Sequence, residues 1–192
     1  ALMLVGVCLG SAQPAQPTTA PTATANAERG GEAEATKPEK SVTEHSVRIG
    51  GVAVSYTATA GTLILRDEKD TPIARIGYVA YARAGVPDLS RCPITFAYNG
   101  GPGSSSIWLH MGALGPRRAV TTDAAATPPP PYEVADNAYS LLDVTDLVMI
   151  DPVGTGVSHA LGKKEDKDFW GVDPDIKSVS QFIVQYVDDN ER

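Results

Sequence analysis

Hydrophobic and polar positions alternate in the part of the chain that follows residue 46. The alternation runs from 47 to 56 and is interrupted by Gly50-Gly51. A period of two is typical of a half-buried strand, and paired glycines accept the positive φ angles of a tight two-residue turn. The pattern predicts a β-hairpin. Two further strand candidates, at 62–65 and 73–82, extend the hairpin to an antiparallel meander.

The hydrophobic pattern changes in the second half of the chain. Residues 93–98 and 146–150 are continuous apolar runs, which are typical of parallel strands buried on both faces. Apolar residues at helical spacing predict a short helix within 107–114 and a longer one over 176–187, with Asp173 as the N-cap of the longer helix. The element order βββ followed by βαβα predicts an α/β fold.

The first 45 residues differ in composition from the rest. Residues 2–9 are apolar and are followed by small residues, which indicates the remnant of a secretory signal peptide at 1–12. From 13 to 41 the chain has no Ile, Leu, Val, Phe, Tyr or Trp, so it lacks the apolar surface that would offset the entropy of ordering. We therefore expect a disordered leader at 13–45, a domain at 46–192, and a periplasmic or secreted protein without stable membrane insertion after signal cleavage.

Composition and charge narrow the functional classes. The 192-residue chain carries 23 acidic and 16 basic side chains, a formal net charge of −7, so no basic field favours binding to nucleic acid. The two cysteines, Cys8 and Cys92, cannot build a disulfide framework, and neither has the Cys/His spacing of a zinc site. We expect no metal, no cofactor and no nucleic-acid partner.

The segment 99–106, which reads Asn-Gly-Gly-Pro-Gly-Ser-Ser-Ser, is the first candidate for chemistry. It lies between a predicted buried strand and a predicted helix. Glycines at the carboxyl end of such a strand let the backbone approach a ligand closely, and their N–H groups can converge on a developing negative charge. The central Pro102 argues against a merely flexible turn.

A second glycine-rich segment, 151–158, follows the other apolar run and reads Asp-Pro-Val-Gly-Thr-Gly-Val-Ser. It differs from the known nucleotide-binding loops. The spacing from Gly156 to Gly162 is one residue too long for a P-loop, and His159 stands where the dinucleotide fingerprint has its third glycine. Nucleotide binding is therefore disfavoured.

Four ordered motifs together resemble the serine carboxypeptidases of peptidase family S10, in particular their bacterial branch. The resemblance implies the amino-terminal half of an α/β-hydrolase fold, a Ser/Asp/His triad, and removal of C-terminal residues from peptide substrates. It also implies that the backbone N–H of Gly101 contributes to the oxyanion hole, and that Asn99 and Gly100 bind substrate, with the Asn99 side chain hydrogen-bonded to the terminal carboxylate. The motifs are 99–106, Leu114-Gly115-Pro116, Asn137-Ala138-Tyr139-Ser140 and 151–158.

The chain departs from this family in ways that bear on activity. Ser104 stands where many members have Cys, and Ala113 where many have Glu, so a disulfide and one carboxylate-recognition group are missing. The Gly-x-Ser-x-Gly motif that presents the nucleophile does not occur in the 192 residues. We expect the triad to lie beyond this chain, which would then be an inactive amino-terminal fragment by itself.

Three other functions remain open on the sequence. A proline iminopeptidase-like hydrolase shares Gly-Gly-Pro-Gly but has His where Asn99 stands. An acyltransferase would use the same nucleophile and oxyanion hole, and a secreted noncatalytic binding module would present the same loops. His45, His110 and His159 are expected to be surface or packed residues rather than catalytic bases, and the sequence leaves the oligomeric state open.

Overall fold

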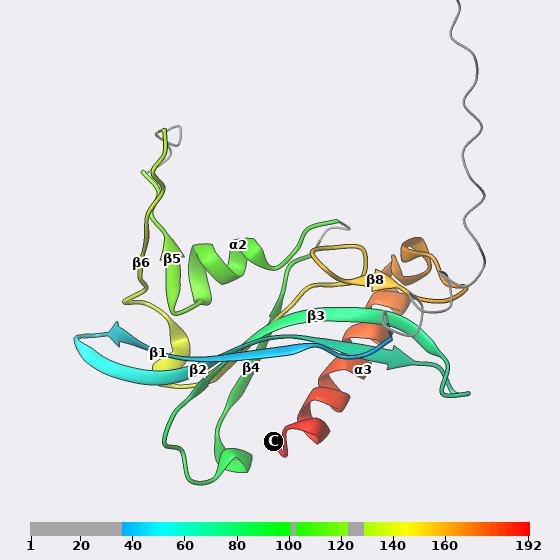
Figure 1. Cartoon of the computed structure of the whole chain (residues 1–192), viewed down its shortest axis with the longest axis horizontal. Coiled ribbons are helices and arrows are strands. Elements are labelled where there is room, and N and C mark those ends of the chain that lie inside the picture. Colours follow the sequence, from blue (N-terminus) through cyan, green and yellow to red (C-terminus); the bar gives the residue numbers. More distant parts are fainter. Residues whose placement is uncertain (1–35, 101–102, 123–128) are drawn as a thin grey trace, which may run out of the picture.

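The computed structural model describes residues 36–100, 103–122 and 129–192. They form a six-stranded mixed sheet with helices on both faces, which is an α/β arrangement (Figure 1). The predicted signal remnant and the predicted leader up to residue 35 lie outside the described residues. The strands follow one another across the sheet in the order β1 (Lys40–Ile49), β2 (Val52–Arg66), β3 (Pro72–Arg83), β7 (Asp146–Ile150) and β4 (Ile94–Tyr98), and the short β8 (His159–Ala160) also pairs with β3.

The predicted meander is present, with two differences in its bounds. β1 and β2 pair antiparallel around Gly50 and Gly51, whose φ angles are +56° and +86°, and β2 pairs antiparallel with β3. β2 is one continuous strand where the pattern predicted two. β1 begins at Lys40, inside the segment 13–45 that the sequence assigned to the leader, so this boundary is corrected. The first seven side chains of β1 are exposed, and backbone pairing with β2 rather than apolar burial holds them in the strand.

β7 and β4 are the predicted parallel pair. All five residues of β7 are buried between β3 and β4, as the continuous apolar run predicted. β4 is the edge strand of the described sheet, and its residues Ile94, Thr95 and Phe96 are only half-buried. The prediction of burial on both faces is therefore wrong for β4, because a strand with one neighbour lacks the second flank that would cover it.

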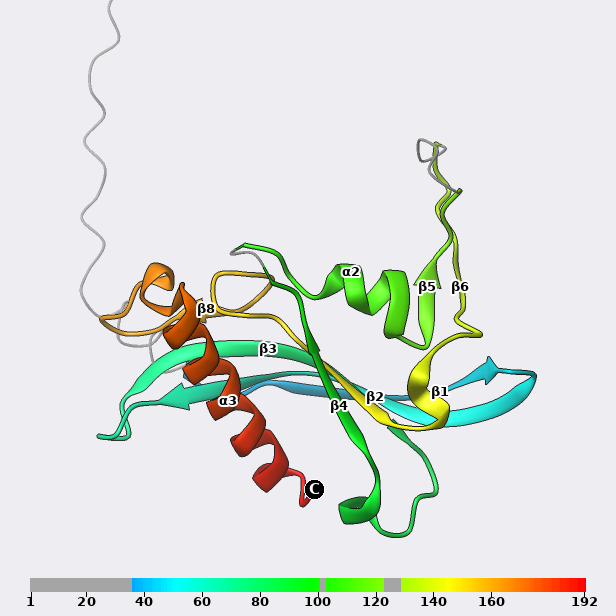
Figure 2. The same ribbon diagram turned by 180° about the vertical axis from the view of Figure 1, so that it is seen from behind.

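Side chains alternate between the two faces of the sheet and build two cores. In β7, Leu147 and Met149 belong to the core on one face, whereas Val148 and Ile150 belong to the core on the other. Helix α3 (Val172–Asp189) packs on this second face through buried residues that include Phe182, and Figure 2 shows it crossing the strands. The first face carries helix α2 (Ile107–Leu109), which continues as a π-helical segment (His110–Leu114).

Helix α3 begins earlier than predicted. Its N-cap is Gly171, with a φ angle of +110°, and its first residue is Val172, so that Asp173 lies in the first turn rather than at the cap. Pro174 is tolerated at the third helical position because the N–H groups of the first turn have no partner within a helix. The predicted helix itself, with Phe182 on its buried face, is confirmed.

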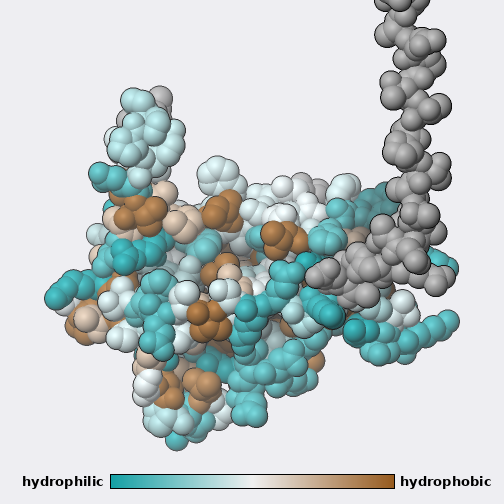
Figure 3. All heavy atoms as spheres, in the orientation of Figure 1, coloured by the Kyte–Doolittle hydropathy of each residue, from teal (hydrophilic) through white to brown (hydrophobic). Residues whose placement is uncertain are grey.

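The remaining described elements are short. β5 (Arg117–Ala119) and β6 (Val134–Asp136) pair as a two-stranded ribbon, which the hydrophobic pattern did not predict. The face drawn in Figure 3 mixes hydrophobic and hydrophilic side chains. No helix within the described residues is long and apolar enough to cross a bilayer. Three turns of 3-10 helix lie in the loops, at Leu89–Arg91, Leu141–Asp143 and Asp166–Phe169.

Candidate functional site

The two glycine-rich segments lie together at one edge of the sheet. Asn99 directly follows β4 and Asp151 directly follows β7, and these strands are parallel neighbours. Ligands of α/β folds bind outside the carboxyl ends of parallel strands. The sequence placed both segments after strands, and the structure brings the two strand ends side by side.

Asn99 and Gly100, the two predicted substrate-binding residues, line a hollow of about 260 Å³. The opposite wall comes from the loop after β7 and from the start of α3, and it includes Trp170. The indole of Trp170 is exposed and lies beside Gly154, where an added Cβ would approach Nε1 to 3.0 Å. The hollow is thus lined by both the polar side chain of Asn99 and the aromatic side chain of Trp170.

The Asn99 side chain is oriented by its own loop. Its amide Nδ2 donates a hydrogen bond of 2.5 Å to Ser104 Oγ. An amide nitrogen carries two N–H groups, so one bond to Ser104 does not exhaust the donor capacity that a carboxylate ligand would use. Ser104 therefore orients the amide group that the resemblance assigns to substrate binding.

The predicted oxyanion residue Gly101 lies outside the described residues, together with Pro102. Its role stays a prediction. Gly103, the next described residue, has a φ angle of +98°. This backbone conformation is strained for residues with a side chain, so position 103 favours glycine.

Ser106 ends the first segment and connects it to β7. Its N–H donates to Asp151 Oδ1 at 2.8 Å, and its hydroxyl donates to the carbonyl oxygen of Ile150. Ser106 is 2% exposed. Sequence reasoning missed this contact because its partners are 45 residues apart and neither residue type signals the other.

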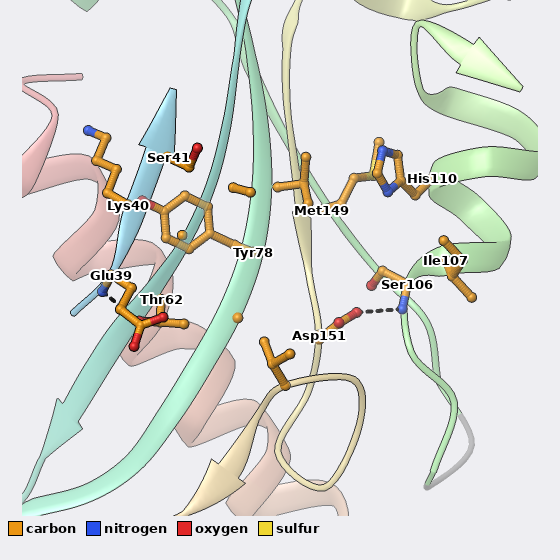
Figure 4. Close-up of a pocket in the computed structure, with 15 residues that line it drawn as sticks. Glu39, Lys40, Ser41, Thr62, Tyr78, Ser106, Ile107, His110, Met149 and Asp151 are labelled. Atoms are coloured by element: carbon orange, nitrogen blue, oxygen red, sulfur yellow. Dashed lines mark hydrogen bonds between the residues drawn. The ribbon is translucent and has the colours of Figure 1, made fainter. Parts of the chain in front are cut away.

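A larger hollow of about 680 Å³ lies on the α2 face of the sheet (Figure 4). Ser106, His110 and Asp151 line one side, and the opposite side comes from the meander, with Thr62, and from Glu39 just before β1. The loops after β4 and β7 border both hollows. Among the described residues, no group of three or more His, Cys, Asp or Glu side chains is arranged to hold a metal ion.

His110 is packed against the aromatic core below α2. Its Nε2 is hydrogen-bonded to the Tyr81 hydroxyl, and the two ring centroids are 5.4 Å apart. Burial lowers the pKa of His110 below its ordinary value of 6.5, and the charge of Asp151 partly opposes this shift. Burial also raises the pKa of Tyr81 to about 12. His110 is therefore held neutral near pH 7.

Acidification is expected to destabilise the protein through His110. The unfolded chain takes up this proton before the folded protein does, so the free energy of unfolding falls as the pH drops below about 6.5, until the folded-state pKa is passed. Urea unfolding of His110→Gln should show that its free energy of unfolding falls less between pH 7.5 and 5.5 than that of the unmodified protein. Equal slopes in the two proteins would contradict the packing described for His110.

Comparison with known proteins supports the fold. No protein-family model and no curated protein matches the chain. Among solved structures, it is similar to Kex1(delta)p, a prohormone-processing carboxypeptidase from Saccharomyces cerevisiae, with a TM-score of 0.51 and 27% sequence identity. The chain is similar in fold to a carboxypeptidase. The match covers 69% of this chain and 28% of the yeast chain, so the chain corresponds to well under half of that protein.

The similarity confirms the coarse part of the sequence-based interpretation, which is an α/β fold of the carboxypeptidase kind. Two features of the site were not predicted. Trp170 reaches the hollow because α3 begins beside the loop after β7, and Asp151 reaches Ser106 because β7 lies beside β4. The position of an aromatic residue directly before the N-cap of α3 is the sequence signal for Trp170.

Proposed function

We propose that this chain belongs to a serine-type carboxypeptidase of the S10 type, which removes C-terminal residues from peptides. The observation that carries the proposal is the position of Asn99 and Gly100. They line a hollow at the carboxyl edge of two parallel strands, in a fold similar to that of a carboxypeptidase. The domain is proposed to be the amino-terminal part of an α/β-hydrolase domain, and the protein to be exported through the signal-like segment 1–12.

Each proposed role follows from the chemistry of peptide hydrolysis. A serine oxygen attacks the carbonyl carbon of the last peptide bond, and the carbonyl oxygen becomes an oxyanion. A backbone N–H at Gly101 would stabilise this charge, because a fixed donor needs little reorganisation during the reaction. Asn99 would donate its second N–H to the terminal carboxylate, and Gly100 would let the peptide approach the backbone. A base takes the serine proton and passes it to the amine of the C-terminal residue, which leaves as the oxyanion collapses, and water then hydrolyses the acyl-enzyme and frees the serine.

The test uses the natural full-length protein and blocked dipeptides with either a free or an amidated C-terminus. Asn99→Ala removes the carboxylate donor, so binding of free-acid substrates should weaken by about 1–3 kcal/mol, mostly as a raised KM. Amidated substrates should be affected less. Asn190→Ala is the matched control, because the Asn190 amide bonds to Tyr186 O at the far end of α3.

The outcomes separate the alternative functions. Equal effects of Asn99→Ala on free and amidated peptides would favour a general hydrolase over a carboxypeptidase. Predominant transfer of the acyl group to an added amine or alcohol would favour an acyltransferase. If a fluorophosphonate probe labels no serine in the full-length protein, the noncatalytic binding module becomes the better interpretation.

A further inference from the structure

The backbone of Asp151 is held by the sheet. Its N–H donates to Gly77 O on β3 at 3.0 Å, and its carbonyl oxygen accepts a 2.7 Å bond from the Ser158 hydroxyl. The same hydroxyl accepts from the Gly77 N–H at 2.8 Å. These three bonds tie Asp151 to β3 as well as to β7, so the sheet sets the position of its carboxylate.

The carboxylate of Asp151 crosses from the end of β7 to the segment after β4. Its Oδ1 accepts the Ser106 N–H at 2.8 Å, the contact drawn as a dashed line in Figure 4. Ser106 is the residue just before α2, where a backbone N–H has no partner within the helix and a negative charge is favourable. Since the Ser106 hydroxyl also donates to Ile150 O, this residue is bound to two successive residues at the end of β7.

The loop after β7 packs against the same carboxylate. Gly156 has a φ angle of +53°, and a Cβ at this position would overlap Asp151 Oδ2. The space taken by the carboxylate therefore requires glycine at 156. One carboxylate oxygen holds Ser106 and the other lies against Gly156, so Asp151 joins the two glycine-rich loops.

The described ends of the segment 99–106 are thus fastened to neighbouring strands. Asn99 continues from β4 and bonds to Ser104, while Ser106 is fastened to β7 through Asp151. We propose that Asp151 is a positioning residue: it fixes the carboxyl end of this loop and thereby the placement of the donors that meet substrate. The inference rests on the proposed function and extends it to a residue that does not itself touch the peptide.

The experiment combines hydrogen–deuterium exchange with kinetics on the natural full-length protein. In Asp151→Ala, exchange in a peptide covering 99–106 should accelerate at least about tenfold, while exchange in the β1–β2 hairpin stays unchanged. Per site labelled by fluorophosphonate, kcat for blocked dipeptides should fall about 10–100-fold, and KM for free-acid dipeptides should rise, because misplaced donors weaken both the transition state and the binding of the terminal carboxylate. Asp151→Asn keeps an oxygen acceptor for Ser106 and should recover most of both properties.

Asp166→Ala is the matched control. Asp166 is also half-buried and accepts a backbone N–H, that of Ala160, at 2.7 Å, but it holds β8 rather than the loop. Exchange at 99–106 and kcat per labelled site should be unchanged in this variant. If Asp151 had a purely structural role, Asp151→Ala would lower the folded fraction and leave kcat per labelled site unchanged.

The outcomes keep the two proposals apart. Unchanged exchange at 99–106 in Asp151→Ala overturns the positioning role, whether or not the protein is active. Accelerated exchange with unchanged kcat per site overturns it as well. An unmodified protein that hydrolyses no peptide overturns the proposed function, while the exchange result still decides whether Asp151 holds the loop. If the alanine variant does not fold, Asp151→Glu is measured instead. It should show faster exchange at 99–106 and a lower kcat per labelled site, each by a smaller factor, and the absence of both changes overturns the positioning role.

Discussion

Replacing Phe182 by alanine is expected to lower the free energy of unfolding by about 3–5 kcal/mol. Phe182 is 0% exposed and contacts Tyr78 and Tyr186, with ring centroids 5.6 Å and 5.9 Å away. It lies at the centre of the core between α3 and the sheet. Removal of the ring leaves a cavity that the surrounding aromatic rings fill only in part. Urea denaturation of the natural full-length protein measures the loss as a lower unfolding midpoint.

Val184 provides the control on the same helix. Its side chain is 61% exposed, so Val184→Ala should change the free energy of unfolding by at most about 0.5 kcal/mol. A loss below about 1 kcal/mol for Phe182→Ala would contradict the packing of α3 against the sheet.

Removal of the Asp146 carboxylate is expected to cost about 3–5 kcal/mol of unfolding free energy, because it leaves a buried guanidinium without its counter-charge. Asp146 is 2% exposed, and its Oδ2 lies 2.6 Å from Arg192 Nη2. Its Oδ1 accepts the backbone N–H of Arg83 at 3.0 Å. The Arg192 side chain is 6% exposed, so water cannot replace the lost partner. Asp146→Ala measured by urea unfolding tests this expectation.

A double-mutant cycle isolates the charge effect at this pair. Combining Asp146→Ala with Arg192→Met removes both charges, so the double variant should recover part of the stability lost in the single one. Asp136→Ala breaks the exposed pair of Asp136 with Arg117, which has the same 2.6 Å separation, and should cost at most about 1 kcal/mol. Similar losses for the two aspartates would mean that burial does not distinguish these pairs.

Local patterns predicted the elements that depend on local burial. The alternation around Gly50-Gly51 predicted the hairpin, since a tight turn favours glycine and a half-buried strand favours alternating apolar and polar residues. The apolar run 146–150 predicted the fully buried β7. The same kind of run at 93–98 predicted too much burial for β4, because apolar character does not reveal how many neighbours a strand has.

The arrangement of the site depended on information that no local pattern contains. The resemblance assigned Asn99 and Gly100 to substrate binding, which stays a prediction, and in the structure both residues line the hollow. The contacts that shape the site join residues far apart in the sequence. Asp151 meets Ser106, and Trp170 lines the same hollow as Asn99, because β7 lies beside β4 and α3 starts at the same edge.

The strand order has a consequence for the protein while it is being synthesised. β4 leaves the ribosome before β7, yet in the described sheet β7 lies between β3 and β4 and is the strand with which β4 pairs. The meander β1–β3 can form early from local contacts, whereas β3 keeps an open edge and β4 has no partner strand in the described sheet until β7 has emerged. Unpaired apolar edges promote association between chains. The nascent chain therefore depends most on chaperones in the interval between the emergence of β4 and the emergence of β7 from the ribosome.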